Sequence, residues 1–520
     1  MDKKYTIWPY KEAFKLEERL HQTRKDKLVL EMGIGASGIP HIGSVGDAIR
    51  VNFVKLAAKD IGYDSILIAF SDDKDGLRKV PLGFPKELEQ YLGVPVSLIE
   101  DPFGCCESYA KHMNNFLVDT LTDLGISYEF KSSTEEYKKG IFNEQIKKIV
   151  SKKELVGKII EEETSSIKKE DWYPIYVECS NCHNVYTTKI SKLDLDKNLV
   201  TYDCIDEFKN KKGCGNSETT NFLNGKAKLT WKADWAARFD RYGVDFECYG
   251  KDLIEAFNAS SRIVKEILNN PNPPNGVFYE LFTTSDGAKI SKSIGNSFTA
   301  KDWLKYASKD SLLLLMLNNP QRAKEASANV IPNYEKDYEL LLYKVYKNDV
   351  YIEGDSTEAL EFKLIKNLNP PEKKPLIYDF SSLCATIEIL GEKGKIADLY
   401  LKRYFKKSFD DLIPIIEKGK MYTNDILKPL HNKENRYNKI TVPNDALYEL
   451  YDFFALEKTE REVQTKVFDL IKKYNLDKKD MFQSLYAIIL KRDKGPKFTT
   501  LSAMLGNEEI RISLESVLTK

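Results

Sequence analysis

The sequence has no uninterrupted apolar run of the length that spans a membrane. A membrane helix needs about 18 to 20 consecutive apolar residues, and no such run occurs in this chain, of which 30% is charged. The N-terminal residues also show no signal-like pattern. We therefore expect neither a membrane protein nor a secreted one.

The chain also lacks an excess of charge of either sign. Its 79 Lys and Arg residues balance 79 Asp and Glu residues, for a net charge of +0. A protein without net charge has no long-range field that attracts a polyanion, so a nucleic-acid partner would have to be held by local basic patches. We find no internal repeat or low-complexity tract, which excludes a repeat architecture.

Cysteine is scarce and unevenly placed. The eight cysteines of this 520-residue chain are clustered, which is not the pattern of a disulfide framework. Clustered cysteines indicate a reducing compartment, so we expect a cytoplasmic protein. A chain of this length is expected to form two to four domains and to bury an ample core.

The first patterned segment predicts a strand, a loop, a helix and a second strand. An apolar run at residues 28–30 predicts the first strand, and residues 65–70 predict the second. Between them, apolar side chains of residues 45–57 recur at the spacing of a helix face. The loop before this helix is rich in residues that forbid regular structure: Gly33, Gly35, Ser37, Gly38 and Pro40. In a parallel sheet such a loop lies at the carboxyl end of its strand, where nucleotides usually bind.

His41 stands at the predicted entrance of this helix. The unpaired amides and the dipole of a helix N-terminus favour phosphate, and an imidazole there can donate a hydrogen bond to a phosphate oxygen. Gly43 would let a nucleotide approach the backbone closely. The alternative is ordinary turn chemistry, because glycine-rich loops alone have a high false-positive rate.

A second string, KISKS at residues 289–293, favours the nucleotide interpretation. Gly287 precedes it and Gly295 follows it, so two lysines and two serines lie on a loop with freedom to close. Lysine side chains can follow the phosphates as pyrophosphate leaves, which stabilises the transition state more than bound ATP. The alternative is a solvated basic loop. Together with PHIGS at residues 40–44, the string indicates ATP used for adenylyl transfer.

These two strings resemble the HIGH and KMSKS signatures of class I aminoacyl-tRNA synthetases. Further segments resemble the bacterial form of the class I lysyl-tRNA synthetase family and occur in the family's order. They are residues 31–44 (EMGIGASGIPHIGS), 70–81 (FSDDKDGLRKVP), 234–238 (DWAAR), 243–246 (GVDF), 250–252 (GKD), 279–282 (YELF) and 289–296 (KISKSIGN).

The resemblance implies a lysine–tRNA ligase. Such an enzyme activates lysine with ATP to lysyl-adenylate and then transfers the lysyl group to the 3′ end of tRNA(Lys). No protein nucleophile is needed, so catalysis would consist of positioning and charge stabilisation, with Mg²⁺ as an additional counter-charge. A lysine pocket needs a carboxylate or an aromatic face for the ammonium group.

The resemblance also assigns candidate site residues. The catalytic candidates are His41, Gly43, Lys289 and Lys292. The candidates for ATP binding are Ser37, Gly38, His41, Gly43, Ser291 and Lys292. The candidates for the lysine pocket are Gly33, Asp72, Asp234, Trp235, Tyr249 and Asp252.

Four cysteines form the stronger metal candidate. Cys179 and Cys182 are separated by two residues, and Cys204 and Cys214 follow after a polar, turn-rich stretch. This pattern resembles a zinc ribbon. Four thiolates suit tetrahedral structural zinc, which would fold a small insertion that has too few apolar residues of its own. His183 could replace one ligand, and the alternative is four unliganded cysteines.

A second cluster is a weaker metal candidate: Asp101, Cys105, Cys106 and His112. In the related family, an Asp-Pro-aromatic-Gly segment followed by Cys and His residues can bind another zinc, and residues 101–104 match its start. Cys106 stands where His is usual, and cysteine is an equally acceptable ligand. The alternative is an ordinary loop and helix start.

The C-terminal half has a helical pattern. Residues 300–317 predict helix with a new start near Asp310, and the helical pattern from residue 334 is broken at 367–375 and near Pro443. The resemblance assigns residues 300–333 to a stem-contact module and residues 334–520 to a helical anticodon-binding region. From composition alone, the helical region could equally serve dimerisation or act as a scaffold.

The predicted fold class is α/β. We expect a Rossmann-type parallel-sheet catalytic domain split between residues 1–98 and 220–299, with a zinc-ribbon-bearing insertion at residues 99–219. An all-α C-terminal region is expected to follow.

Three functions remain open from the sequence. The leading one is a monomeric, cytoplasmic lysine–tRNA ligase whose partners are tRNA(Lys), lysine and ATP, with structural Zn²⁺. The second is a related class I adenylating enzyme for another amino acid or for a non-tRNA acceptor. The third is a non-enzymatic RNA-binding protein with a decayed nucleotide fold, against which the intact His41, Gly43, Lys289 and Lys292 argue.

Overall fold

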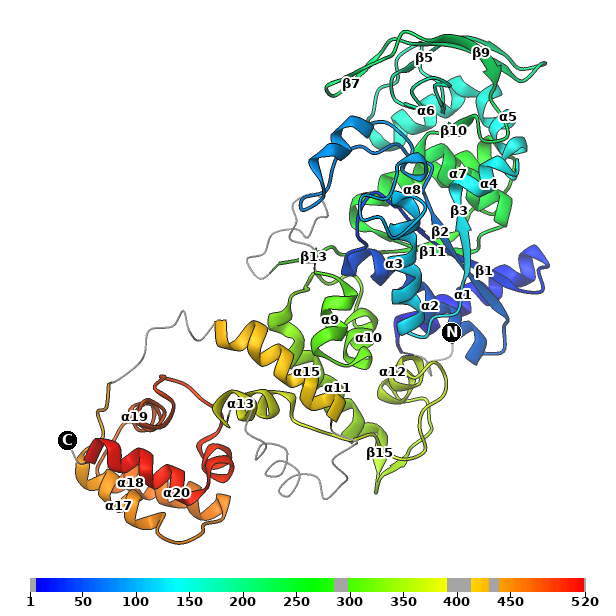
Figure 1. Ribbon diagram of the computed structural model, residues 1–520. Coiled ribbons are helices and arrows are strands. Elements are labelled where there is room, and N and C mark those ends of the chain that lie inside the picture. Colours follow the sequence, from blue (N-terminus) through cyan, green and yellow to red (C-terminus); the bar gives the residue numbers. More distant parts are fainter. Residues whose placement is uncertain (1–5, 285–297, 391–412, 430–438, 519–520) are drawn as a thin grey trace. The chain divides into compact units, whose positions relative to one another are not determined.

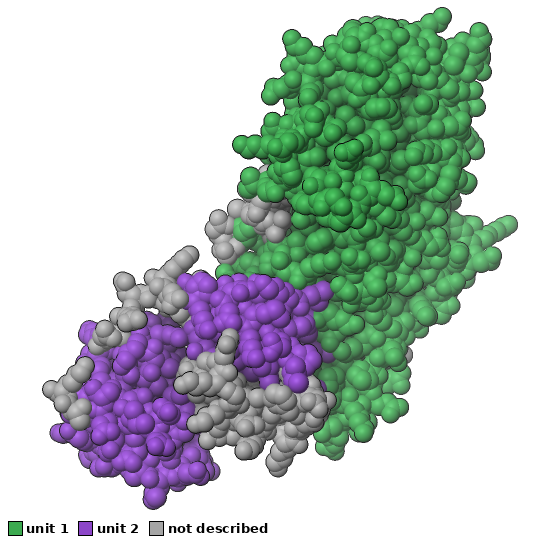
Figure 2. All heavy atoms as spheres, viewed as in Figure 1, with its two compact units in different colours: residues 1–303, 309–330, 341–375 green, residues 304–308, 331–340, 376–520 purple. Residues whose placement is uncertain are grey.

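The computed structural model describes residues 6–284, 298–390, 413–429 and 439–518 (Figure 1). The predicted site residues Lys289, Ser291 and Lys292 lie outside these ranges. The chain forms two compact units, which Figure 2 distinguishes by colour. Unit 1 comprises residues 1–303, 309–330 and 341–375, and unit 2 comprises residues 304–308, 331–340 and 376–520.

Unit 1 is built on a five-stranded sheet in which all neighbouring strands are parallel. In spatial order the strands are β12 (Asn275–Tyr279), β11 (Phe246–Gly250), β1 (Leu28–Ile34), β2 (Ser65–Ser71) and β3 (Glu129–Ser132). The strand order reverses between β1 and β11, which is the switch point where ligands of such sheets bind. The predicted Rossmann-type sheet is confirmed.

The predicted strand, loop, helix and strand are confirmed as β1, α2 (Ile42–Asp60) and β2. Helix α2 is buried along most of its length because it packs on β1, β2 and β11 and also against α1 (Trp8–Thr23). It ends just before Gly62, whose positive φ of 99° is unfavourable for residues with a side chain. Because α2 packs on β1 and β2, the loop before α2 is held at the carboxyl end of β1.

Two further helices cover the sheet near the switch point. Helix α7 (Trp231–Tyr242) and helix α8 (Ile254–Glu266) pack against each other. Their contact is built from aromatic side chains, with Trp235 and Phe239 each edge-on to Phe257. Helix α7 therefore carries the whole DWAAR string, residues 234–238, into the core beside β1.

The insertion after β2 contains short helices and small antiparallel sheets (Figure 1). Its helical elements are η1 (Lys86–Tyr91), η2 (Val96–Leu98), α3 (Tyr109–Asp123), α4 (Ser133–Lys138), α5 (Asn143–Ser151) and α6 (Lys153–Thr164). Its strands pair as β5–β6–β9, β4–β10 and β7–β8. They are β4 (Ile175–Val177), β5 (Thr188–Asp194), β6 (Leu199–Cys204), β7 (Glu207–Phe208), β8 (Lys211–Lys212), β9 (Ser217–Asn221) and β10 (Ala227–Leu229).

Strand β3 lies within residues 99–219, the range that the sequence assigned to the insertion, yet it pairs with β2 in the central sheet. Its sequence, EFKS, carries no apolar run, because an edge strand that is only half-buried does not need one. The sequence pattern therefore missed this strand.

The rest of unit 1 follows the central sheet, together with α9 and α11, each of which has residues in both units. The elements are η3 (Lys251–Leu253), β13 (Phe282–Thr283), α9 (Ala300–Tyr306), α10 (Lys309–Leu317), β14 (Lys324–Glu325), η5 (Ala328–Val330), α11 (Ile331–Val345), β15 (Tyr346–Lys347), β16 (Val350–Tyr351) and α12 (Thr357–Ile365). The predicted new helix start near Asp310 is confirmed by α10. The hairpin β15–β16 was not predicted; Asn348 and Asp349, both with positive φ, form its two-residue turn.

Unit 2 is α-rich. Its further helical elements are α13 (Phe380–Leu390), α15 (Ile413–Tyr422), η7 (Thr423–Leu427), α17 (Asn444–Phe453), α18 (Glu460–Lys473), α19 (Lys478–Leu490) and α20 (Phe498–Leu518). The helical pattern predicted from residue 334 is confirmed in the described part of this region, where Leu447, Leu450 and Leu485 are buried in one core. Within the described part of the chain, no helix is both long and apolar enough to cross a bilayer.

Candidate functional site

The loop between β1 and α2 places His41 at the N-terminus of α2, as the sequence predicted. His41 is the N-cap residue, and its Nδ1 accepts a hydrogen bond from the backbone N–H of Ser44 at 3.2 Å. An Nδ1 that accepts leaves the proton of the neutral ring on Nε2. His41 is therefore oriented as a donor through Nε2 at a helix terminus that favours phosphate.

Gly43 makes room for this histidine. A Cβ at Gly43 would lie 2.8 Å from Cε1 and 2.9 Å from Nδ1 of His41. Any side chain at this position would displace the imidazole ring. The sequence predicted that Gly43 admits a nucleotide, and the structure adds that glycine is required for the position of His41.

A cavity of about 140 Å³ opens at the carboxyl ends of β1 and β2. Among the predicted site residues, Ser37 and Asp72 line it. The lining comprises Gly35, Ala36 and Ser37 from the loop after β1, and Asp72, Asp75, Gly76, Arg78, Lys79, Pro81 and Val96 from the segment after β2. The cavity thus joins the loop that carries the HIGH-like string to the FSDDKDGLRKVP string.

Asp72 and Asp75 share one buried cation. Lys228 Nζ lies 2.9 Å from Asp72 Oδ1 and 2.7 Å from Asp75 Oδ1. Burial opposes the charge on Lys228, yet the two carboxylates hold its pKa well above the usual range. Burial raises the pKa of Asp72 to about 7, and repulsion from Asp75 adds to the effect. Two carboxyl groups therefore meet one ammonium group at the wall of the cavity.

A second group of buried charges lies around Arg238 of α7. Its Nη1 is 2.8 Å from Glu31 Oε1, and its Nε is 3.6 Å from Asp234 Oδ2. Glu247 completes the group and accepts a 2.8 Å hydrogen bond from Trp235 Nε1. All of these charged side chains are buried. Three carboxyl groups are therefore compensated by one guanidinium group.

The pKa of Glu31 follows from this arrangement. Burial raises it from the ordinary 4.5 to about 7, against the attraction of Arg238. Burial and the nearby Glu31 also raise the pKa of Glu247 well above its usual range. Near neutral pH these carboxyl groups are therefore held partly as neutral acids.

We expect a Glu31→Gln variant to gain stability relative to the wild type as pH rises from 5 to 8. The unfolded chain loses this proton near pH 4.5 and the folded chain near pH 7. The stability that protonation of Glu31 contributes is therefore complete below about pH 4.5 and is lost as pH rises through about 7. Glutamine has no such titration, so the difference in unfolding free energy should change by about 1–3 kcal/mol.

Urea unfolding of both proteins at pH 5, 6, 7 and 8 measures this difference. Glu154→Gln, at an exposed position, controls for the change in net charge. A difference between Glu31→Gln and the wild type that is independent of pH would contradict the prediction.

The predicted lysine-pocket residues occupy different environments. Asp234, Trp235 and Tyr249 are buried, and the Tyr249 ring stacks on Phe257 at 4.2 Å. Asp252 is exposed directly after β11, on the other side of the switch point from the loop after β1.

Gly33 lies in β1, where an added Cβ would be 2.9 Å from Arg238 Nη1. Glycine at this position therefore leaves room for the guanidinium group. Of the six predicted residues, Asp72 alone lines the 140 Å³ cavity.

Sequence reasoning missed the buried cations Lys228 and Arg238. Lys228 stands inside the short apolar strand β10, and Arg238 lies on the buried face of α7. A charged residue within an apolar strand was the available signal, because such a residue must find a partner. Its partners, however, are distant in the sequence and could not be named.

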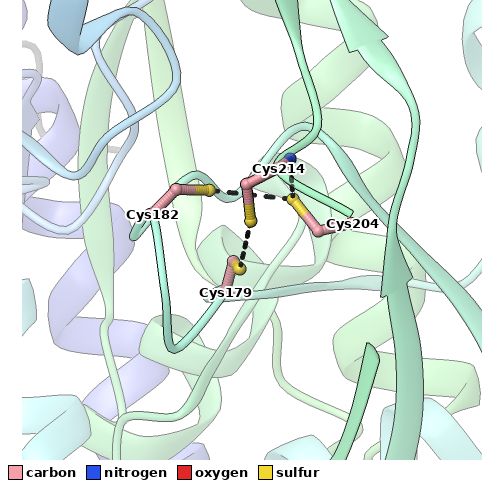
Figure 3. A group of neighbouring side chains, drawn as sticks. All are labelled: Cys179, Cys182, Cys204 and Cys214. Carbon is pink, nitrogen blue, oxygen red and sulfur yellow. Dashed lines mark hydrogen bonds between the residues drawn. The ribbon is translucent and has the colours of Figure 1, made fainter. Parts of the chain in front are cut away.

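The four cysteines of the stronger metal candidate come together (Figure 3). The Sγ atoms of Cys179 and Cys214 are 3.6 Å apart, and those of Cys182 and Cys204 are 3.7 Å apart. Four sulfurs placed tetrahedrally at about 2.3 Å from zinc are about 3.8 Å from one another. The four thiols therefore have the dimensions of a structural zinc site.

Donors from the surrounding chain point at these sulfurs. The Cys204 Sγ accepts from the backbone N–H of Cys214 at 3.4 Å and lies 3.2 Å from Thr187 Oγ1. Hydrogen bonds to sulfur stabilise thiolates that bind a metal. The donor set, the distances and these contacts fit zinc.

The second candidate cluster also converges. Cys105 Sγ lies 3.1 Å from His112 Nδ1 and 3.6 Å from Cys106 Sγ, and His112 Nδ1 is 3.4 Å from Asp101 Oδ1. The carboxylate of Asp101 additionally accepts backbone N–H groups of the same loop. The geometry therefore accommodates a metal but also gives Asp101 a role in holding the loop.

Comparisons with known proteins identify the family. The family model for class I tRNA synthetases (K) matches residues 6–365. A lysine–tRNA ligase of Cenarchaeum symbiosum is 32% identical over 511 residues, which cover 97% of each chain. A lysine–tRNA ligase of Rickettsia africae is 32% identical over 530 residues, which cover 99% of this chain and 98% of the relative.

A solved structure of a glutamate tRNA ligase from Elizabethkingia meningosepticum matches 95% of this chain and 99% of its own, with a TM-score of 0.42 and 13% identity. A similarity this weak supports no statement about function. The family match and the near-full-length identities, in contrast, are decisive. The chain belongs to the class I lysyl-tRNA synthetase family.

Proposed function

We propose that this protein is a lysine–tRNA ligase that activates lysine with ATP and transfers it to the 3′ end of tRNA(Lys). The observation that carries the proposal is the 32% identity to lysine–tRNA ligases along 97% of the chain. The site supports it, because His41 and the glycine-rich loop lie at the switch point of a parallel sheet.

The proposed roles in ATP binding follow from the loop geometry. The imidazole of His41 donates through Nε2 to a phosphate oxygen, while Gly43 keeps the ring in place. Ser37 and Gly38 provide the adjoining wall for the nucleotide. The site residues outside the described ranges, Lys289, Ser291 and Lys292, are proposed to stabilise the departing pyrophosphate, and Mg²⁺ would supply further positive charge there.

The lysine pocket is proposed to lie among the carboxyl groups at the carboxyl ends of β1 and β2. Asp72 and Asp75 line the cavity, and the buried Asp234, Glu31 and Glu247 lie around Arg238. A carboxylate at the cavity wall can pair with an ammonium group of lysine. Trp235, Tyr249, Asp252 and Gly33 are proposed to shape the same region.

A structural Zn²⁺ is proposed at Cys179, Cys182, Cys204 and Cys214. When bound, it would cross-link β6 and the turns that flank it, in a sheet with few buried side chains. A second Zn²⁺ at Asp101, Cys105, Cys106 and His112 is also proposed, supported by the convergence of these four side chains.

The remaining proposals concern organisation and location. Residues 300–333 are proposed to contact the tRNA stem and residues 334–520 to bind the anticodon, supported by the α-rich unit 2. We further propose a monomeric, cytoplasmic enzyme. The free thiols of all eight cysteines support a reducing compartment.

The test is tRNA charging with each of the twenty amino acids, using total tRNA and Mg-ATP. Transfer RNA is present throughout, because some synthetases of this class activate their amino acid only when it is bound. We expect lysine alone to be charged and Lys292→Ala to charge about a hundredfold more slowly. Lys158→Ala, at an exposed lysine of α6 outside the regions proposed to bind ATP, lysine or tRNA, should charge at the wild-type rate.

Charging of a different amino acid would show that the lysine assignment is wrong. Absence of charging with every amino acid would favour the RNA-binding alternative. An unchanged rate in Lys292→Ala would remove the assigned role of the KISKS string.

A further inference from the structure

The first turn of the cysteine cluster lies against the segment that forms the cavity. We name residues 178–187 the knuckle and residues 72–97 the pocket segment. Asn184 of the knuckle is buried, and its Nδ2 donates to the backbone oxygen of Leu92 at 2.8 Å. Its own backbone oxygen accepts from the N–H of the ligand candidate Cys179 at 3.2 Å. One residue thus connects the cysteine cluster to the pocket segment.

A ladder of backbone hydrogen bonds continues from this contact to the cavity. The N–H of Val185 donates to Gly93 O at 2.9 Å, and the N–H of Gly93 donates to Leu77 O at 2.8 Å. Within the pocket segment, the N–H of Val96 donates to the oxygen of Asp75 at 3.0 Å. Both Val96 and Asp75 line the cavity.

Gly76 and Gly93 let the backbone of the pocket segment approach the knuckle closely. A Cβ at Gly76 would lie 2.7 Å from Gly93 O and 2.8 Å from the Tyr186 ring. A Cβ at Gly93, whose φ is +86°, would collide with the amide of Asn184. The knuckle and the pocket segment are therefore interlocked, so neither can shift without the other.

Side chains of the knuckle also hold charged residues of the pocket segment. The Tyr186 hydroxyl accepts from Arg78 Nε at 3.0 Å, and Arg78 lines the cavity. Glu178 pairs with the buried Lys74 at 3.3 Å. These contacts add side-chain restraints to the backbone ladder on the same two segments.

We propose that Asn184 is a positioning residue that couples the four-cysteine metal site to the pocket segment. Its catalytic consequence rests on the proposed ligase function, whereas the coupling itself does not. Through Leu92 and the ladder, Asn184 sets the positions of Asp75 and Val96 at the cavity wall. A metal held by the cysteines would fix the knuckle and thereby the wall of the substrate site.

Hydrogen exchange of the full chain loaded with zinc tests the coupling directly. Asn184→Ala removes the donor to Leu92 O and both acceptor contacts to the N–H groups of Tyr186 and Thr187. We expect peptides from residues 72–97 to exchange about tenfold faster, while peptides of α2 keep the wild-type rate. Zinc content, measured on the same sample, should remain that of the wild type.

Asn221→Ala is the matched control. Asn221 also accepts a turn N–H, that of Leu223 at 2.7 Å, in the same insertion. Its hydrogen bond to Leu223 lies away from the pocket segment, so exchange of residues 72–97 should be unchanged. Equal acceleration in Asn184→Ala and Asn221→Ala would overturn the proposal.

A second variant covers the case in which Asn184→Ala loses zinc or fails to fold. Tyr186→Phe removes only the hydroxyl that accepts from Arg78. Faster exchange of residues 72–81 with full zinc content would support the coupling. Wild-type exchange of the pocket segment in a folded Asn184→Ala would overturn it, as would wild-type exchange in Tyr186→Phe where Asn184→Ala loses zinc or does not fold.

Kinetics then separate positioning from simple loss of folded enzyme. Loosening the pocket segment lowers the fraction of binding-competent enzyme, so the KM for lysine or ATP should rise several-fold while kcat stays within about twofold. Loss of folded protein would instead lower kcat and leave KM unchanged. Failure of every variant and of the wild type to charge tRNA would refute the ligase function but leave the exchange result standing.

Discussion

Replacing Arg238 by Met should lower the free energy of unfolding of unit 1 by about 3–5 kcal/mol. Arg238 is the cation beside the buried carboxyl groups of Glu31 and Asp234, and its guanidinium group lies 4.4 Å from the centre of the Phe70 ring. Methionine fills similar space but leaves those carboxyl groups without a charged partner. They must then either remain buried as anions or take up protons, and both cost stability.

Chemical unfolding of the full chain measures this loss in the transition that belongs to unit 1. Arg241→Met is the matched control, because Arg241 lies on the same helix but is exposed. Its substitution should change stability by no more than about 0.5 kcal/mol. A loss in Arg238→Met no larger than in Arg241→Met would contradict the prediction.

A double variant tests the cause. Adding Glu31→Gln to Arg238→Met removes the nearest buried acid, so part of the lost stability should return. If the loss came only from poorer packing of methionine against Phe70, the second substitution would restore nothing.

Replacing Cys204 by Ser should abolish zinc binding at the four-cysteine site and unfold the three-stranded sheet of the insertion. Strands β5 and β9 contain no fully buried residue, and β6 buries only alternate residues, so this sheet has little apolar surface of its own. The free energy of zinc binding by four thiolates is on the order of 10 kcal/mol. Loss of one thiolate forfeits most of it and leaves the sheet without its main source of stability.

Metal content by atomic emission and limited proteolysis of residues 179–221 measure the two effects. Cys384→Ser is the control, since Cys384 is another buried thiol, in unit 2, whose Sγ donates to Gly419 O at 3.9 Å. It should keep both zinc and resistance to protease. A Cys204→Ser protein with the wild-type zinc content and the same resistance would show that the four cysteines are not a metal site.

The elements around the nucleotide loop could be predicted because their signals are local. Short apolar runs identified β1 and β2, and apolar residues at the spacing of a helix face identified α2. The small residues before residue 41 identified the loop. The same local logic put His41 at the helix entrance. Strand β3 was missed because a half-buried edge strand carries no comparable pattern.

The four cysteines of the stronger metal candidate could also be predicted from the sequence. Thiols that must share one tetrahedral ion are recognisable from their type and spacing, and the structure brings their four sulfurs together. The KISKS string was likewise recognised from its residue types and spacing. The division of the chain into a catalytic domain, an insertion, a stem-contact module and an anticodon-binding region remains a prediction.

The sequence by itself determined the parallel-sheet fold and the glycine-rich loop, whose signals lie in short segments, and the candidate ligands, which residue type and spacing identify. Only the tertiary structure decided the charges around the site. Lys228 meets Asp72, and Arg238 meets Glu31, across long stretches of chain. Asn184 likewise finds Leu92 only in the folded protein. Such pairs are chosen by burial, because a buried polar group must find a partner wherever the fold provides one, and no local pattern records which partner that is.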